Sequence, residues 1–161
     1  QLLAQLKVQL PVRPVKGQMI AYQAPKGLLQ RVVLKDGRYI IPRADGLLLV
    51  GSTLEEAGFD KTTDNAALAS LKHSAETMLP ALATCPVVHQ WAGLRPGSPA
   101  GVPFIGALKE WPNVFVNAGH YRNGLVLAPA STHLLVDQLL EREPLIDPAP
   151  YQPTPERLIQ A

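Results

Sequence analysis

The chain has 161 residues, of which 47% are hydrophobic, and a formal net charge of +2 at pH 7. This length suits one sizeable core or parts of two domains, and no run of lysine and arginine is long enough to follow a phosphate backbone, which argues against nucleic acid as a partner. The single cysteine, Cys85, excludes an internal disulfide, and the longest aliphatic run, Leu47–Val50, is far shorter than the roughly 20 residues of a membrane helix. We therefore expect a soluble, cytoplasmic protein without a membrane span.

The first half of the chain predicts a short helix followed by an antiparallel sheet. Gln1–Leu6 has the pattern of a helix already under way and does not begin with methionine, so we expect a fragment of a longer polypeptide. Residues 11–17, with two prolines and a glycine, predict a connector. Asp-Gly at 36–37 and Ala-Asp-Gly at 44–46 are hairpin signals between apolar runs. The sheet of about four strands is expected to use residues 18–24, 29–34, 39–41 and 47–52.

The second half predicts two helices and two more strands. Asp64 is a candidate N-cap for a helix that ends near Leu79. Its apolar stripe consists of Ala67, Leu68, Leu71, Ala75, Met78 and Leu79. The elements that follow are a strand at 87–94, a Pro/Gly-rich loop, a short buried strand at 113–118, a helix at about 123–141 and, from Pro144, an extended tail with five of the 16 prolines. We expect an α+β fold in which helices flank a largely antiparallel mixed sheet.

The stretch WAGLRPGSPAG, residues 91–101, presents a candidate binding residue. Period-two alternation places Arg95 at the end of a strand, on the same face as Trp91 and Gly93. A guanidinium group binds a carboxylate through two parallel hydrogen bonds, so Arg95 is a candidate anchor for an acidic small molecule. The alternative is a structural arginine that pairs with one of the 13 acidic residues.

The stretch GHYRNGLVLAP, residues 119–129, follows an apolar strand and opens a helix through Gly119 and Gly124. The N–H groups and the positive dipole end of a helix's first turn favour an anion or an electron-rich carbonyl group. The alternative is that the two glycines only ease packing.

Three stretches in register, GRYIIPRADGLLLVGST, WAGLRPGSPAGVPFIG and NAGHYRNGLVLAP, resemble the C-terminal half of the D-amino-acid oxidase superfamily, most closely glycine oxidases of the thiamine-pathway type. The similarity runs from Pro14 to about Leu140. It implies FAD as the cofactor of the full-length protein and two domains that alternate along the chain. These are pieces of an FAD-binding domain at residues 1–11 and 112–141, a substrate-binding domain at 12–111, and a Pro-rich tail at 142–161.

The resemblance also implies the site residues. Arg95 would hold the substrate carboxylate, Tyr39 and Leu54 would line the pocket, and Arg122 would lie near the flavin and the pocket mouth. The cofactor-facing residues would be Gly119, His120, Arg122, Asn123, Gly124 and Leu125. The residues alone favour an ordinary strand aromatic for Tyr39. The alternatives for Arg122 and Leu54 are a solvated turn residue and part of the core. The histidines show no paired metal-ligand spacing, so no metal is expected.

The G-x-G-x-x-G fingerprint that places a dinucleotide on a helix N-terminus does not occur in these 161 residues. We therefore expect that this chain alone does not hold FAD and that a missing N-terminal half is its partner, in a protein that forms homo-oligomers. The implied activity is oxidation of glycine, sarcosine or small D-amino acids to the imine and keto acid, with release of ammonia or amine and of hydrogen peroxide. Two alternatives remain: a secondary-amine oxidase of the sarcosine or proline type, and a non-catalytic carboxylate-binding or interaction module left from a truncated oxidase.

Overall fold

A computed structural model of the chain describes residues 2–158, so Gln1 of the predicted opening helix and residues 159–161 of the predicted tail lie outside the description. The described residues form two compact units. Unit 1 contains residues 2–13 and 95–158, and unit 2 contains residues 14–94. The chain mixes antiparallel sheets with helices, which confirms the predicted α+β class.

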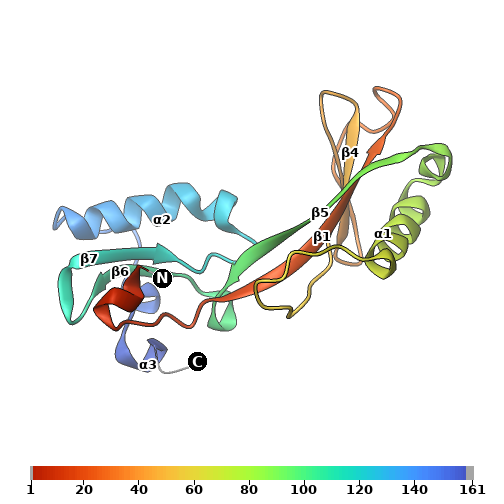
Figure 1. Ribbon diagram of the computed structural model, residues 1–161. Helices are drawn as coiled ribbons and strands as arrows, with labels where there is room; N and C mark the ends of the chain where they lie inside the picture. Colours follow the sequence, from red (N-terminus) through yellow and green to blue (C-terminus); the bar gives the residue numbers. More distant parts are fainter. Residues whose placement is uncertain (1, 159–161) are drawn as a thin grey trace. The chain divides into compact units, whose positions relative to one another are not determined.

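A five-stranded sheet of order β2-β3-β4-β1-β5 dominates unit 2 (Figure 1). Its strands are β1 (Arg13–Gln23), β2 (Val33–Lys35), β3 (Arg38–Pro42), β4 (Leu47–Gly51) and β5 (Val87–Gly97). Both predicted hairpins are confirmed. Asp36 and Gly37 have positive φ values of 50° and 74° between paired Lys35 and Arg38, as a tight two-residue turn requires. The second turn closes where the Arg43 N–H donates to the Leu47 carbonyl at 2.9 Å.

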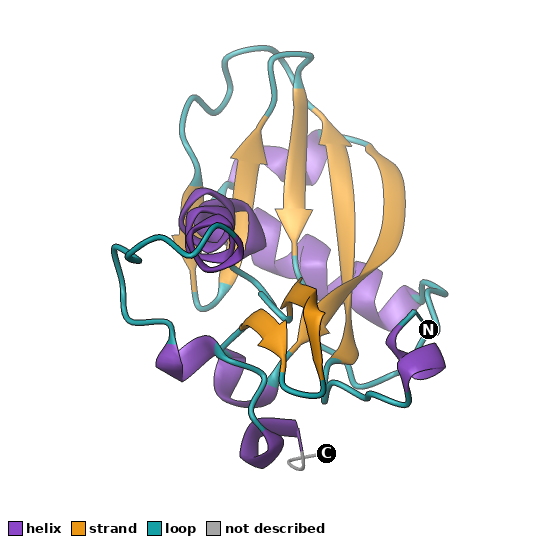
Figure 2. Ribbon diagram, turned by 90° about the vertical axis from the view of Figure 1, so that its left-hand side faces the viewer, coloured by secondary structure: helices purple, strands orange, loops and turns teal. Residues whose placement is uncertain are grey.

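Helix α1 (Asn65–Met78) covers one face of this sheet, as Figure 2 shows. The predicted cap is confirmed, because Asp64 Oδ1 accepts a hydrogen bond from the Ala67 N–H at 2.8 Å. The predicted stripe is also confirmed, with Leu71 and Ala75 fully buried. They pack in one core with Ile20, Tyr22, Ala24, Ile40, Leu48, Val50 and Leu82, the last from the short 3-10 helix η2 (Pro80–Thr84).

Two predictions, for residues 11–17 and for residues 29–34, are wrong. The expected connector at 11–17 is largely strand, because β1 begins at Arg13 and accepts Pro14 near its start, where a missing N–H is tolerated. The expected strand at 29–34 is reduced to the three residues of β2. Leu28 and Leu29 pack on the core as loop residues, so tertiary packing overrides the local apolar pattern.

Unit 1 is built on a two-stranded antiparallel sheet of β6 (Phe104–Leu108) and β7 (Trp111–Ala118), with helix α2 (Gly124–Leu139) packed against both strands. The predicted helix near 123–141 is confirmed. Strand β7 was expected to be buried, but among its residues only Val116 is. Strand β6 was expected to be loop. Its middle residue, Gly106, has a φ of 144°, a backbone conformation that favours glycine, and the position of a Cβ there lies 2.8 Å from the end of the flexible Gln138 side chain of α2. This glycine weakens the local strand signal.

The remaining elements of unit 1 are short. They are the 3-10 helices η1 (Leu3–Leu6), η3 (Pro99–Gly101) and η4 (Ala149–Tyr151) and the single turn α3 (Pro155–Leu158). The segment expected to form an extended tail therefore contains helical turns, and it is anchored by Arg157. The Arg157 guanidinium donates to the carbonyl groups of Val102 at 2.9 Å and Pro103 at 3.2 Å and stacks 4.2 Å above the Phe104 ring.

Candidate functional site

The two sequence stretches that carry the predicted chemistry meet in unit 1. The Tyr121 N–H donates to the Pro96 carbonyl at 3.0 Å, and Gly97 forms a β-bridge with His120. The Ser98 hydroxyl donates to the Gly119 carbonyl at 2.7 Å. Half-buried Arg95 at the end of β5 is therefore one residue away from a backbone junction with the predicted cofactor-facing turn.

The turn from β7 into α2 has a conformation that only a few residues adopt. Gly119 has a φ of 81°, and a Cβ on it would lie 3.0 Å from Ser98 Cβ and 3.3 Å from Val12 Cγ2. Tyr121 also has a positive φ, of 50°. Glycine at 119 is thus favoured both by the backbone conformation and by the close approach of residue 98.

The N-terminus of α2 is exposed and has no side-chain cap. Asn123 occupies the N-cap position, but its side chain makes no capping hydrogen bond. The Leu125 side chain is 91% exposed, and Arg122 and Asn123 are exposed as well. A 16-residue helix without a side-chain cap presents unpaired N–H groups and the positive end of its dipole.

His120 contributes a buried polar atom beside this helix end. Its Nε2 is buried and has no hydrogen-bond partner among residues 2–158. Burial lowers the pKa of His120 below its usual value of 6.5, so the imidazole is neutral at neutral pH. A buried imidazole nitrogen without a partner and an uncapped helix end both fit a polar, planar cofactor edge, which would supply the missing hydrogen-bond partners.

Tyr39 and Leu54 belong to unit 2. Tyr39 pairs with Gly51 across β3 and β4, and its hydroxyl lies 2.8 Å from the position of a Cβ on Gly51 and 3.9 Å from Met19 Sδ. Its neighbour Ile40 faces the core under α1, so Tyr39 faces the opposite side of the sheet. Leu54 is 52% exposed. The sheet face that α1 leaves uncovered therefore carries Tyr39.

A buried polar cluster, here the Lys16 cluster, fixes the backbone around Leu54. Lys16 and Gln18 are 3% and 0% exposed. Lys16 Nζ lies 3.0 Å from Asp60 Oδ2 and 3.5 Å from Glu55 Oε2, and Gln18 Nε2 donates to Glu55 Oε1 at 3.1 Å. Hydrogen bonds from the Thr62 backbone N–H and from Lys16 lower the pKa of Asp60 to about 2.

The side chain of Leu54 points away from the Lys16 cluster. The backbones of Lys16 and Glu55 exchange two hydrogen bonds, of 2.9 and 3.0 Å. Thr53 and Glu55 both direct their side chains to the cluster, so alternation places Leu54 on the other side. Sequence reasoning missed the cluster, although polar residues at 16 and 18 of an apolar strand are a usable signal.

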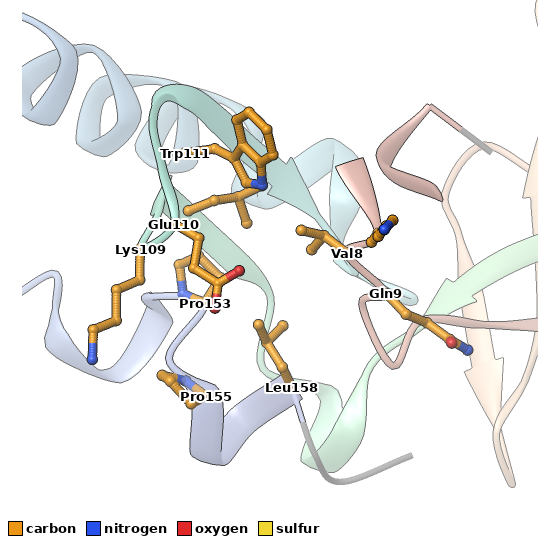
Figure 3. A pocket seen from close by; sticks show the side chains of 10 residues that line it. Val8, Gln9, Lys109, Glu110, Trp111, Pro153, Pro155 and Leu158 are labelled. Carbon is orange, nitrogen blue, oxygen red and sulfur yellow. The ribbon is translucent and has the colours of Figure 1, made fainter. Parts of the chain in front are cut away.

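The pocket drawn in Figure 3 has a volume of about 270 Å³ and contains none of the predicted site residues. The residues that line it include Trp111, Leu158, Pro153, Pro155, Lys109 and Glu110. Within residues 2–158, no three side chains of His, Cys, Asp or Glu come together as metal ligands. The same described part of the chain has no helix long and apolar enough to cross a membrane.

Comparisons with known proteins identify the family of the chain. The model of the family described as FAD dependent oxidoreductase matches residues 1–138. The chain is 57% identical over 153 residues to glycine oxidase of Pseudomonas aeruginosa and 39% identical over 130 residues to glycine oxidase of Bacillus subtilis. These alignments cover 95% and 81% of this chain but only 42% and 35% of the two relatives.

Among solved structures, glycine oxidase from Geobacillus kaustophilus superposes with a TM-score of 0.88 at 36% identity, over 96% of this chain and 42% of that one. The chain thus spans less than half the length of these relatives, and its fold corresponds to that part of a glycine oxidase. The resemblance noted in the sequence is confirmed at the level of the family, and the chain belongs to the FAD-dependent oxidoreductase family.

Proposed function

We propose that this chain is the substrate-side part of an FAD-dependent amino-acid oxidase that acts on glycine, sarcosine or a small D-amino acid. The observation that carries the proposal is the junction in unit 1, where the Arg95 stretch and the turn into α2 are joined by backbone hydrogen bonds. Relatives named glycine oxidase, at up to 57% identity, support the substrate class.

In the proposed reaction the substrate loses two electrons and two protons and becomes an imine. Water then hydrolyses the imine to the keto acid and releases ammonia or the amine, while oxygen accepts the electrons and becomes hydrogen peroxide. FAD supplies the two-electron carrier when it is bound. The protein's own task is to orient the substrate α-carbon and to exclude water.

Arg95 is proposed to bind the substrate carboxylate. A half-buried guanidinium forms stronger hydrogen bonds to a carboxylate than an exposed one, because less water competes for it. The fork geometry also fixes the orientation of the acid group, which a lysine would not do. The exposed Arg122, on the turn before α2, is proposed to stand at the mouth of the pocket.

Residues 119–125 are proposed to hold the flavin edge. The N–H groups of Gly124 and Leu125 and the positive end of α2 favour electron-rich oxygen, and Asn123 and the neutral His120 offer polar side chains. The positive φ of Gly119 brings its backbone close without a Cβ. This part of the proposal rests on the buried His120 Nε2 and the uncapped helix end.

For unit 2, the proposed roles rest on the family resemblance. The Tyr39 hydroxyl is proposed to assist in binding the carboxylate, and Leu54 is proposed to be an apolar pocket wall. The sheet face without α1, on which Tyr39 lies, supports accessibility to a ligand.

The proposal extends to domains and partners. Residues 12–111 would belong to the substrate-binding domain, and residues 1–11 and 112–141 to an FAD-binding domain completed by an N-terminal half. Homo-oligomers and a cytoplasmic location of the whole protein are part of the same proposal.

The experiment places this chain in the Pseudomonas aeruginosa glycine oxidase in exchange for the segment that aligns with it, so that the relative supplies the portion that the alignment leaves uncovered. We expect the purified chimera to be yellow and to produce hydrogen peroxide from glycine or sarcosine. Replacing Arg95 with Met should raise KM about 100-fold, because an ion-paired carboxylate is lost, and Arg95→Lys should recover only part of this. Arg142 is exposed, so Arg142→Met is the matched control and should change neither KM nor kcat.

A chimera that binds FAD but oxidises none of glycine, sarcosine and D-alanine would contradict the oxidase proposal. It would then favour a carboxylate-binding or interaction module. Covalently attached flavin in the chimera would favour a secondary-amine oxidase instead.

A further inference from the structure

Ser98 is buried at the junction of unit 1 although nothing in the proposed reaction uses it. Its side chain belongs to a residue that is 5% exposed, three positions after Arg95. The Ser98 hydroxyl makes no capping bond to η3 and donates instead to the Gly119 carbonyl, 21 positions along the chain, at 2.7 Å. This hydrogen bond matters for stability because both groups are buried. A buried hydroxyl or carbonyl group without its partner has neither a protein nor a water hydrogen bond.

The contact joins two segments that the backbone already brings into register. Tyr121 N–H bonds to the Pro96 carbonyl, Gly97 bridges to His120, and Ser98 bonds to Gly119, so three successive residues on one side contact three on the other. The Ser98 hydrogen bond is made by a side chain. A substitution of Ser98 can therefore remove it while the backbone contacts of residues 96 and 97 stay in place.

The geometry at this link admits little variation. A Cβ on Gly119 would meet Ser98 Cβ at 3.0 Å, closer than ordinary van der Waals contact. Ser98 therefore occupies the space that a side chain at position 119 would need. Loss of the hydroxyl removes the Ser98 donor from the Gly119 carbonyl, and a glycine peptide that loses this bond turns easily because glycine adopts many backbone conformations.

We propose that Ser98 is a positioning residue that holds the turn 119–121, and with it His120 and the start of α2, at a fixed place relative to Arg95. This inference rests on the proposed function, in which Arg95 binds the substrate and the turn binds the flavin. Arg95 itself does not need Ser98 to meet a carboxylate. Removing the hydroxyl should therefore impair the orientation of bound substrate more than its binding.

The test uses the chimera described above with Ser98→Ala, Ser98→Thr and the control Ser131→Ala. Ser131 is also 5% exposed, and its hydroxyl also donates to a carbonyl, that of Ala128 at 3.2 Å, but it lies inside α2. We expect Ser98→Ala to lower kcat for glycine about 10- to 100-fold with KM changed less than about twofold, and to shift the visible absorption band of the bound flavin. Ser98→Thr, which keeps the hydroxyl, should restore most of kcat, and Ser131→Ala should match the parent.

A Ser98→Ala chimera with unchanged kcat, or with the same loss as Ser131→Ala, would overturn the inference and leave the oxidase proposal standing. A second measurement needs no activity: amide hydrogen exchange of Tyr121 in this chain without cofactor should be faster in Ser98→Ala than in Ser131→Ala. If the parent chimera is inactive, the proposed function fails, and the exchange rates still decide whether Ser98 holds the turn. Equal exchange rates in the two variants would overturn the link itself. Should Ser98→Ala not fold, Ser98→Cys, which keeps the volume and weakens the donor, is measured in its place with the same expected direction.

Discussion

Replacing Gly119 with alanine tests the close approach on which the junction of unit 1 depends. An alanine at a φ of 81° costs about 1–2 kcal/mol in left-handed strain, offset by about 0.4–1 kcal/mol from the smaller entropy of the unfolded chain. The new methyl group would also lie 3.0 Å from Ser98 Cβ and 3.3 Å from Val12 Cγ2, and such overpacking costs about 1–3 kcal/mol. We expect Gly119→Ala to destabilise unit 1 by about 1–4.5 kcal/mol.

Gly101 provides the matched control. It also lies in unit 1 and has a similar φ of 71°, but nothing lies within 4 Å of the position of its Cβ. Gly101→Ala therefore carries the strain without the crowding and should cost about 1 kcal/mol. The difference between the two variants isolates the contact with Ser98 and Val12.

The chain's two tryptophans allow each unit to be followed separately, because Trp111 lies in unit 1 and Trp91 in unit 2. Urea unfolding of both glycine variants is measured by Trp111 fluorescence in a Trp91→Phe background. Free energies of unfolding that agree within about 0.5 kcal/mol would refute the crowding at Gly119. The backbone strain that both variants share would then explain both losses.

Two further predictions concern the cores of the units. Burial, followed by the nearby charge of Glu76, raises the pKa of Tyr22 to about 12 from an ordinary value near 10. Folded Tyr22 therefore keeps its proton to higher pH than unfolded Tyr22, so its contribution to the stability of unit 2 is complete below pH 10 and is lost between about pH 10 and 12. Urea midpoints followed by Trp91 fluorescence should fall less steeply over this pH range in Tyr22→Phe than in the parent chain. Equal falls of the midpoint with pH in the two proteins would contradict this. Arg157→Ala should destabilise unit 1 by about 1–3 kcal/mol, since the guanidinium bonds to carbonyl groups before β6 and stacks on Phe104. Arg157→Lys should recover less than half of the loss by Trp111 fluorescence, and full recovery would show that the planar fork is not needed.

Local sequence signals predicted the elements that are stabilised locally. The Asp36-Gly37 turn forms where expected because those residues adopt positive φ readily. Helix α1 begins where Asp64 supplies a cap, and its apolar stripe faces the core because its spacing matches the helical period. The family motifs pointed to the correct family for the same reason: their residues are contiguous in the chain.

Contacts between distant segments were beyond local signals. Strand β6 is short and contains Gly106, and it is stabilised by pairing with β7 and by α2. Polar Lys16 and Gln18 are buried because acidic partners reach them from residues about 40 positions away. The roles of the predicted site residues stay predictions. The structure brings together those of unit 1, where the Arg95 stretch meets residues 119–121, and Tyr39 and Leu54 belong to unit 2.

The sequence by itself determined the α+β class, the two hairpins, the capped helix α1 and the stretches that carry the family resemblance, because turn geometry, capping and side-chain periodicity act over a few residues. Only the tertiary structure decided that Ser98 bonds to Gly119, that the Arg95 stretch meets the turn into α2, and that the Pro-rich C-terminal segment is anchored through Arg157. These contacts join residues 21 or more positions apart, and their free energy depends on burial and close packing, which no local pattern encodes.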